Sequence, residues 1–403
     1  MVNVWLAGAL VSALVGAADA KNRPLIVGHR GAPGYLPDHT LQGYTLAVET
    51  GVDVIEPDLV ATKDGVLVCR HEPNIIDTTD VGDHPEFADR LKTVTLDGIA
   101  TKGYWVSDFT LEEIKTLRAV QPLSERDQSY NGLFEIPTFD EVIALAVNLT
   151  ASAGRTIAIY PETKHPTYHK DLGLPLEDKM LAALGAVGWN DSTAPVFIQS
   201  FEQSNLIELS QKTSITLVQL VDGFDSNPVT GEVVFAPPSD RPYDWTVAGR
   251  KDYFGYLVTP EGLAEVATYA SIISPWKRYI LKATAAKLDS NGLASDYNGD
   301  GKVSDADYYV HEYQTLIDDA HAAGLKVHAW TMRDEDYRLA VNYSSDPVQE
   351  YNELFNMGLD GIFSDNCKTA VAARDAWLAA TDAPTDAPTG APTAAPTDAP
   401  NQC

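Results

Sequence analysis

Two carboxylates and a histidine lie within one short stretch of the chain, residues 52–74, which reads VDVIEPDLVATKDGVLVCRHEPN. Two runs of strand-forming residues flank Asp64-Gly65, and an Asp-Gly pair in this position is typical of a tight hairpin turn. A turn at this pair places Asp58 opposite His71, and a turn one residue earlier places Glu56 there. Both registers bring the two carboxylates and the histidine to one face of the hairpin. A hard divalent cation beside a proton donor needs such groups, although a solvated, charged sheet face has the same pattern.

Polar side chains of related chemistry end apolar runs elsewhere in the chain. His29 and Arg30 close the run PLIVGHRG, Glu162 and Lys164 close TIAIYPETK, and Trp330 lies within LKVHAWTM. If these runs are parallel strands, their carboxyl ends meet at one edge of the sheet, and the side chains that follow them converge there. The expected site therefore combines carboxylates, histidines and two cations.

Runs typical of strands alternate with helical patterns along most of the chain. Strands are expected at residues 24–31, 52–62, 66–71, 156–164, 196–201, 216–221, 325–332 and 360–364. Helices are expected at residues 41–51, 138–148, 176–184, 204–210, 263–267, 309–323, 348–357 and 369–378. The alternation indicates an α/β fold, and the lack of a Gly-rich phosphate loop favours a (β/α)8 TIM barrel over an open doubly wound sheet. The inserted hairpin and a long irregular segment, residues 77–130, are expected to cap the active-site end.

The charge balance narrows the classes of partner. The chain has 57 acidic and 29 basic residues, a net charge of −28, in 403 residues of which 44% are hydrophobic. Such a charge argues against nucleic acid or anionic membranes as partners and suits an exported protein that must stay soluble, and it would repel an anionic small-molecule substrate at long range. A phosphate site in this chain must be a local basic exception.

Both ends of the chain differ in composition from the part between them. Residues 1–20 contain an apolar run and end in Ala18-Asp19-Ala20, which indicates a signal peptide, with an uncleaved anchor as the alternative. Residues 21–380 are the expected barrel domain, without a stable membrane span after cleavage. Residues 381–403 repeat Thr-x-Ala-Pro and indicate a spacer for cell-wall or matrix association, or an inert tail. A secreted, extracellular or periplasm-like location is predicted.

The cysteines and the sequons are two further features that depend on whether the protein is secreted. Cys69 and Cys367 either form a disulfide or remain free thiols, and the sequence leaves this open. Sequons at Asn148, Asn190 and Asn342 permit N-glycosylation in a secretory pathway.

Residues 296–307 are similar to an EF-hand calcium loop. The expected ligands are Asp296, Asn298, Asp300, Lys302, Ser304 and Asp307. An aspartate takes the last position, where the motif has a bidentate glutamate, so weaker calcium binding is expected. The motif also predicts a helix from about Tyr308. The alternative is an acidic turn without a metal.

Taken together, the motifs of the chain resemble the glycerophosphodiester phosphodiesterase family. The matching pieces, in family order, are His29-Arg30-Gly31, Pro37-Asp38-His39-Thr40, Ile55-Glu56-Pro57-Asp58-Leu59 with Thr62-Lys63-Asp64-Gly65, His71-Glu72, Ile136-Pro137-Thr138, Pro161-Glu162-Thr163-Lys164, Gln199-Ser200-Phe201, Val327-His328-Ala329-Trp330-Thr331 and Gly361-Ile362-Phe363-Ser364-Asp365. The resemblance covers residues 24–375. It implies a TIM barrel that hydrolyses glycerophosphodiesters to glycerol 3-phosphate and an alcohol.

The resemblance also implies a role for each matching residue. His29 and His71 correspond to the general acid/base pair, Arg30 and Lys164 to the phosphate contacts, and Glu56, Asp58 and Glu162 to the metal ligands. Trp330 is expected to form a wall of the glycerol pocket or to pack in the core. Two positions depart from the family pattern: Asp38 replaces a glutamate, and Glu72 replaces the aspartate after the second histidine.

Oxygen ligands select calcium or magnesium over zinc, and calcium is favoured here. Two other functions share these residues. One is a phospholipase D-like hydrolase of choline or ethanolamine phospholipids on the same fold, and the other is a catalytically inactive wall or matrix protein. Ile136-Pro137-Thr138 and residues 327–331 favour the glycerophosphodiesterase, and the complete set of histidines and carboxylates argues against loss of catalysis.

Overall fold

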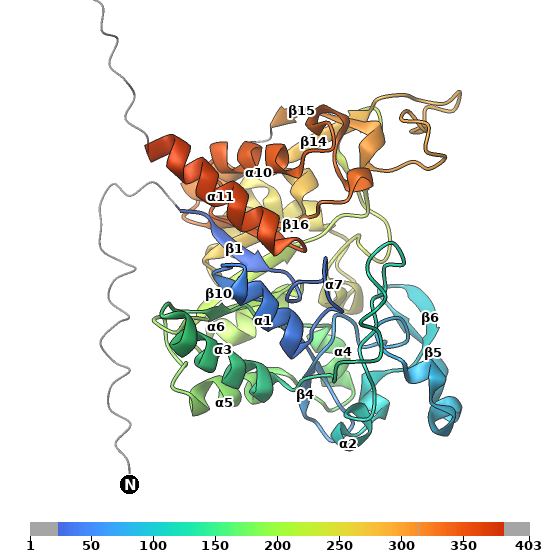
Figure 1. Cartoon of the computed structure of the whole chain (residues 1–403), viewed down its shortest axis with the longest axis vertical. Helices are drawn as coiled ribbons and strands as arrows, with labels where there is room; N and C mark the ends of the chain where they lie inside the picture. The colour runs from blue at the N-terminus through green and yellow to red at the C-terminus, as the bar shows by residue number, and fades with distance from the viewer. Residues whose placement is uncertain (1–22, 314, 383–403) are drawn as a thin grey trace, which may run out of the picture.

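The computed structural model describes residues 23–313 and 315–382 (Figure 1). The expected signal peptide and the repeats after residue 382 lie outside these residues, so both stay predictions. Within the described ranges, no helix combines the length and the apolar character needed to cross a membrane.

A closed sheet of parallel strands forms the centre of the molecule. Its strands are β1 (Leu25–Gly28), β2 (Val54–Ile55) with β3 (Asp58–Ala61), β7 (Ala158–Ile159) with β8 (Glu162–Thr163), β9 (Phe197–Ser200), β10 (Thr216–Val221), β13 (Ile272–Pro275), β16 (Lys326–Met332) and β17 (Gly361–Ser364). β1 pairs with both β17 and β2, β2 pairs with β7, and β8 pairs with β9, so no edge is left between the first and last strands. With β2–β3 and β7–β8 each taken as one interrupted strand, the ring is the eight-stranded barrel that the sequence predicts.

Helices follow the barrel strands and cover their outer surface. They are α1 (Leu41–Glu49), α3 (Phe139–Ala153), α4 (Pro166–Asp171), α5 (Glu177–Ala186), α6 (Gln203–Ser210), α7 (Tyr243–Ala248), α8 (Pro260–Val266), α9 (Leu316–Ala322), α10 (Pro347–Asn356) and α11 (Cys367–Asp382). Thr40 begins α1 by accepting a hydrogen bond from the Gly43 amide, as its sequence position predicts. Thr138 begins α3 in a capping box with Glu141. One large apolar core lies between these helices and the strands.

The segment expected as a loop at residues 77–130 is more ordered than predicted. It contains the hairpin β5 (Lys92–Leu96) and β6 (Ile99–Gly103) and the short helix α2 (Leu111–Ile114), and it has an apolar cluster of its own. Asp97-Gly98, both at positive φ, form the hairpin turn. The same Asp-Gly signal that was used at Asp64-Gly65 would have identified it. In Figure 1 this hairpin lies on the side of the molecule away from α3 and α5.

The register of the first hairpin differs from both expected registers. β3 pairs antiparallel with β4 (Leu67–Cys69) so that Leu59 is opposite Cys69, and Asp58 therefore lies beside Arg70. The turn is a three-residue loop with Gly65 at φ 81°, which shifts the pairing by one residue relative to either two-residue turn. His71 follows the end of β4 and reaches the site from a loop.

One further expectation is wrong, and one alternative that the sequence left open is decided. The helix expected at residues 309–323 is divided into the strand β15 (Tyr308–Tyr313) and the helix α9, because β15 finds an antiparallel partner in β14 (Leu281–Ala285). The Cys69–Cys367 disulfide is absent: both are buried free thiols, and the Cys367 sulfur lies 3.3 Å from the carbonyl oxygen of Gly31.

His169 in α4 is fully buried, and neither ring nitrogen has a hydrogen-bond partner. Burial and the neighbouring His165 and Lys179 lower the pKa of His169 to about 3. The folded state therefore holds this imidazole neutral, while the unfolded chain protonates it with a pKa near 6.5. The contribution of the neutral His169 to the free energy of unfolding is therefore present above pH 6.5 and is lost as the pH falls towards 3.

We predict that His169→Leu removes this loss of stability at acidic pH. Relative to the wild type, the free energy of unfolding of the variant should increase by about 2 kcal/mol between pH 7 and pH 5. Urea unfolding of both proteins at the two pH values measures the difference. An equal change in both proteins would show that His169 does not titrate as its burial requires.

Candidate active site

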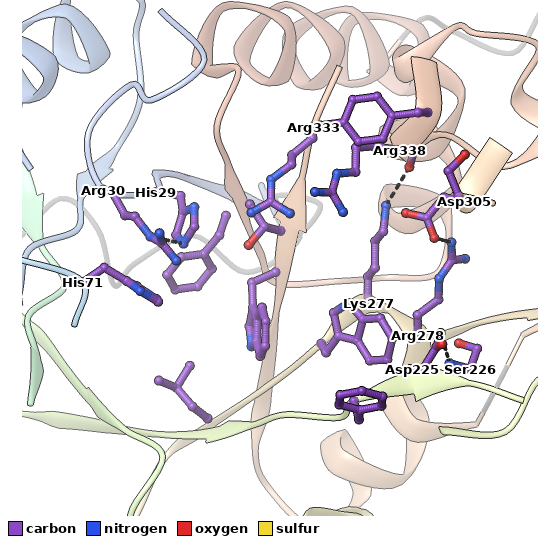
Figure 2. A pocket seen from close by; sticks show the side chains of 18 of the residues that line it. His29, Arg30, His71, Asp225, Ser226, Lys277, Arg278, Asp305, Arg333 and Arg338 are labelled. Carbon is purple, nitrogen blue, oxygen red and sulfur yellow. Dashed lines mark hydrogen bonds and ion pairs between the residues drawn. The ribbon is translucent and has the colours of Figure 1, made fainter. Parts of the chain in front are cut away.

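Side chains from several strand ends converge on a cavity of about 970 Å³. His29 follows β1, Glu56 and Asp58 lie at the break between β2 and β3, Glu162 begins β8, and Lys164 follows it. His71 enters from the loop after β4. All of these residues, with Arg30 and Trp330, line the cavity, so the structure brings together the whole set that the sequence predicts for catalysis, phosphate contact and metal binding. Figure 2 shows Arg30, His29 and His71 on one side of it.

Three buried carboxylates, Glu56, Asp58 and Glu162, offer oxygen atoms that all lie within 4.8 Å of one another. In the described part of the chain, no other group of histidine, cysteine and carboxylate side chains meets the same criterion for a metal site. Glu56 accepts hydrogen bonds from the Arg30 amide at 2.6 Å and from Gln199 Nε2 at 2.8 Å.

The Asp58 carboxylate also contacts the side chain of His39, a residue for which the sequence predicted no role. His39 Nε2 lies 3.0 Å from Asp58 Oδ2, and His39 Nδ1 lies 2.9 Å from the hydroxyl of Tyr44. His39 is fully buried at φ 50°, a conformation uncommon for a histidine. The motif containing His39 was visible in the sequence, but its contact with Asp58 depends on the fold.

The electrostatics of the three carboxylates favour a bound cation. Burial, with Asp58 and Glu162 nearby, raises the pKa of Glu56 well above its usual value. Burial raises the pKa of Glu162 to about 8, although Lys164 opposes the shift. Burial also opposes ionisation of Asp58, but His39, Lys164 and His71 hold its pKa well below the usual value. Asp58 Oδ1 is buried without a hydrogen-bond partner, and a hard divalent ion would satisfy it.

His29 lies between a carboxylate and a cation. Its Nδ1 is 2.6 Å from Asp365 Oδ1, and its Nε2 is 3.2 Å from Arg30 Nε. Because the guanidinium can only donate, Nε2 must be the accepting nitrogen, and Nδ1 carries the hydrogen that is donated to Asp365. The basic nitrogen of His29 therefore faces the cavity beside Arg30.

His71 repeats the same arrangement with different partners. Its Nδ1 is 3.0 Å from Glu72 Oε1, and its Nε2 is 3.2 Å from Lys164 Nζ. Glu72 replaces the aspartate expected after this histidine and still reaches Nδ1. Its other oxygen lies 3.4 Å from His165 Nε2, and His165 Nδ1 lies 3.6 Å from Asp97 in the β5–β6 turn. The capping hairpin thus supports the second histidine through charged contacts.

Both imidazoles are neutral at physiological pH in the ligand-free protein. Burial and Arg30 lower the pKa of His29 to about 4, although Asp365 opposes the shift. Burial, Arg30 and Lys164 lower the pKa of His71 to about 3, although Glu72 opposes the shift. Each histidine is thus in the form that accepts a proton.

Asp365 contacts three basic side chains. The sequence predicted only that this residue follows a strand. Besides His29, it accepts hydrogen bonds from Arg126 Nη2 at 2.7 Å and from Arg333 Nε at 2.8 Å. These cations hold the pKa of the buried Asp365 well below its usual value. Arg126 comes from the irregular segment after α2, where no sequence pattern pointed to a site.

Trp330 lies at the border between the main cavity and a second hollow of about 490 Å³. Its indole nitrogen donates to the carbonyl oxygen of Ser274 at 2.9 Å, and its ring meets Phe201 edge-on. Trp330 is thus a wall residue with a fixed orientation, as one of the two sequence interpretations expected.

The expected calcium loop, residues 296–307, is separate from the three carboxylates. Asp296 accepts hydrogen bonds from the amides of Gly299 and Gly301, and Asp307 accepts from those of Tyr297, Asn298 and Ser304. A strand follows the loop where the motif predicts a helix. Asp300, Lys302 and Ser304 line the main cavity, so the loop forms part of its wall. Calcium binding here stays a prediction.

The barrel and the site together define an enzyme that acts on phosphate esters. The profile of the glycerophosphoryl diester phosphodiesterase family matches residues 29–369, and the chain belongs to this family. A glycerophosphodiester phosphodiesterase of Arabidopsis thaliana, GDPD6, is 34% identical over 362 residues, which cover 85% of this chain and 84% of the relative. A glycerophosphodiester phosphodiesterase of Haemophilus influenzae is 27% identical over 377 residues, 87% and 90% of the two chains.

Solved structures show the same fold at low identity. A protein of Silicibacter pomeroyi assigned as a glycerophosphoryl diester phosphodiesterase has a TM-score of 0.56 at 18% identity, over 89% of this chain and 95% of that one. A phosphodiesterase of Oleispira antarctica, solved with the product sn-glycerol-3-phosphate, has a TM-score of 0.50 at 18% identity, over 87% and 97%. Both comparisons agree with the barrel.

We predict that calcium raises the melting temperature through residues 296–307, because an ion that binds only to the folded loop stabilises the folded state by mass action. Asp296→Ala combined with Asp300→Ala should abolish the part of the rise that comes from this loop. Melting curves of wild type and variant across a calcium titration measure the effect. The same calcium-dependent rise in both proteins would identify the loop as an acidic turn.

Proposed function

We propose that the protein hydrolyses glycerophosphodiesters, such as glycerophosphocholine and glycerophosphoethanolamine, to sn-glycerol 3-phosphate and an alcohol. The observation that carries the proposal is the pairing of each histidine with a phosphate-binding cation next to the three carboxylates. The names of the two relatives and the product-bound structure support the same reaction.

In this proposal, Arg30 and Lys164 bind the non-bridging oxygens of the diester. Their positive charges offset the negative charge that repels a nucleophile, and they stabilise the additional charge of the transition state. A divalent cation held by Glu56, Asp58 and Glu162, with calcium favoured over magnesium, would supply further charge neutralisation of the phosphate.

The two histidines divide the proton transfers. One accepts through Nε2 the proton of the nucleophile, which is water or, in the cyclic-phosphate route that the family resemblance implies, the glycerol 2-hydroxyl. The other donates a proton to the leaving alcohol oxygen. Arg30 and Lys164 lower the pKa of these imidazoles, so an anionic diester bound to the two cations raises it again. Substrate binding thereby prepares one histidine to carry the proton that the leaving group requires.

The alternative functions receive less support from the site. A phospholipase D-like hydrolase would share His29, His71 and the carboxylates, and the product of the reaction distinguishes it. A catalytically inactive wall protein does not require both histidines to keep their carboxylate partners. We further propose that the protein is secreted, on the basis of the leader-like residues 1–20, and that the Thr-x-Ala-Pro repeats attach it to a wall or matrix.

We predict that the purified protein converts glycerophosphocholine to glycerol 3-phosphate and choline, and that a strong chelator abolishes the reaction. Phosphorus NMR of the reaction with and without chelator identifies the product, and readdition of calcium should restore activity better than magnesium. Full activity after exhaustive chelation would remove the metal role from the three carboxylates. Release of phosphocholine in place of glycerol 3-phosphate would contradict the proposed bond cleavage.

We also predict that His29→Ala and His71→Ala each lower kcat by roughly 10²–10⁴-fold, the usual loss for a general acid or base. His84→Ala is a matched control, because His84 lies in the capping segment and contacts Asp80 and Glu86. Steady-state kinetics, with circular dichroism to verify folding, measure the effect. Near-normal turnover in either active-site variant would show that its histidine is structural.

A further inference from the structure

The main cavity extends well beyond the residues that the proposed reaction needs. Away from His29 and His71 it is lined by Lys277, Arg278 and Arg338, and Arg333 lies between these residues and His29, as Figure 2 shows. We call these four residues the distal cations. A cavity of about 970 Å³ is at the upper end of the range for small-molecule sites, and a glycerol phosphate unit fills only part of it.

Arg338 carries a positive charge without a carboxylate partner. Among the described residues no carboxylate lies within ion-pair distance of its guanidinium, although Asp305 and Glu125 are near enough to interact electrostatically, and its Nε is buried without a hydrogen-bond partner. Its guanidinium lies 4.9 Å from the centre of the Tyr337 ring, which leaves the charge available to a ligand. The Arg338 carbonyl oxygen accepts from Lys277 Nζ at 3.4 Å, so the backbone of Arg338 is tied to a second cation.

Arg278 supplies a second unpartnered donor. It is 3% exposed and ion-paired through Nη2 with Asp305, whereas its Nη1 is buried without a partner. A buried guanidinium nitrogen without an acceptor is costly, and an anionic ligand would satisfy it.

The other two distal cations, Lys277 and Arg333, already have carboxylate partners, and three carboxylates on the cavity wall accept hydrogen bonds from other groups. Lys277 donates to Glu350 at 2.7 Å, and Arg333 donates to Asp365 at 2.8 Å. Of the carboxylates on the cavity wall, Asp225 accepts from the Ser226 amide, Asp300 from the Lys302 amide, and Glu125 from the Tyr337 hydroxyl. Around the distal cations, the buried guanidinium donors without an acceptor are therefore Arg338 Nε and Arg278 Nη1.

We propose that the distal cations form a subsite for a phosphate carried by the alcohol part of the substrate. The inference rests on the proposed function and deepens it. With the scissile phosphate on Arg30 and Lys164, the glycerol unit is small and common to all substrates, so the large cavity is left for the alcohol. The preferred substrates are then glycerophosphodiesters whose alcohol bears a further phosphate. The net charge of −28 repels such molecules at long range, which makes a local cationic subsite necessary for their binding.

Two substrates that differ by a single phosphate test the proposal. We expect kcat/KM of the wild type to be roughly tenfold higher for glycerophosphoinositol 4-phosphate than for glycerophosphoinositol, the size expected for a charge-assisted hydrogen bond. Arg338→Gln should lower this ratio to near one, and Arg338→Lys should give an intermediate ratio because it keeps the charge but loses the planar fork.

Arg241→Gln is the matched control, because Arg241 lines the second hollow and is ion-paired with Asp240. This variant should keep the wild-type ratio. If the wild type hydrolyses both substrates without preference, or prefers a cationic alcohol such as choline, the subsite is refuted while the proposed function stands. If Arg338→Gln keeps the wild-type ratio, Arg338 does not bind the second phosphate. If the wild type hydrolyses neither these substrates nor glycerophosphocholine, the proposed function itself fails.

Discussion

The close approach of three buried carboxylates is the constraint on which the rest of the site depends. Glu56, Asp58 and Glu162 lie within 4.8 Å of one another at the centre of the barrel mouth, where burial and mutual repulsion both oppose ionisation. The protein compensates with donors directed at these carboxylates, among them the Arg30 amide and Gln199. A positive charge among the three carboxylates would stabilise their ionised forms, and their oxygen atoms are close enough together to hold a metal ion.

The barrel accommodates this cluster through two breaks in its strands. Pro57 separates β2 from β3 and Pro161 separates β7 from β8, and proline removes a ladder hydrogen bond at each position. The breaks adjoin the metal carboxylates: Pro57 lies between Glu56 and Asp58, and Pro161 precedes Glu162. The Glu162 amide still donates to the Pro57 carbonyl oxygen at 3.0 Å, so neighbouring strands remain joined where the carboxylates turn inward.

The two histidines share one physical design. A carboxylate accepts from Nδ1 of each, which orients the ring, and a cation beside Nε2 adds to the effect of burial in lowering the pKa of the ring. In the proposed mechanism, the cations that bind the phosphate are therefore the same groups that help to lower the pKa of the two histidines. The protein has a net charge of −28, so this local concentration of positive charge gives the site a different electrostatic potential from the surrounding surface.

The sequence determined the barrel and the residues that converge on its main cavity, because each lies in or after a recognisable strand and matches a local motif. The roles of these residues in proton transfer, phosphate contact and metal binding stay predictions. Hairpin pairing was misjudged because a three-residue turn and a two-residue turn share the Asp-Gly signal, and only the paired strand distinguishes them. The strand β15 was taken for a helix because its partner β14 is distant in sequence. The contacts of Arg126 with Asp365, of His39 with Asp58 and of His165 with Glu72 were decided by the tertiary structure alone. Such pairings depend on how loops of different strands approach one another in space, and no spacing along the chain encodes them.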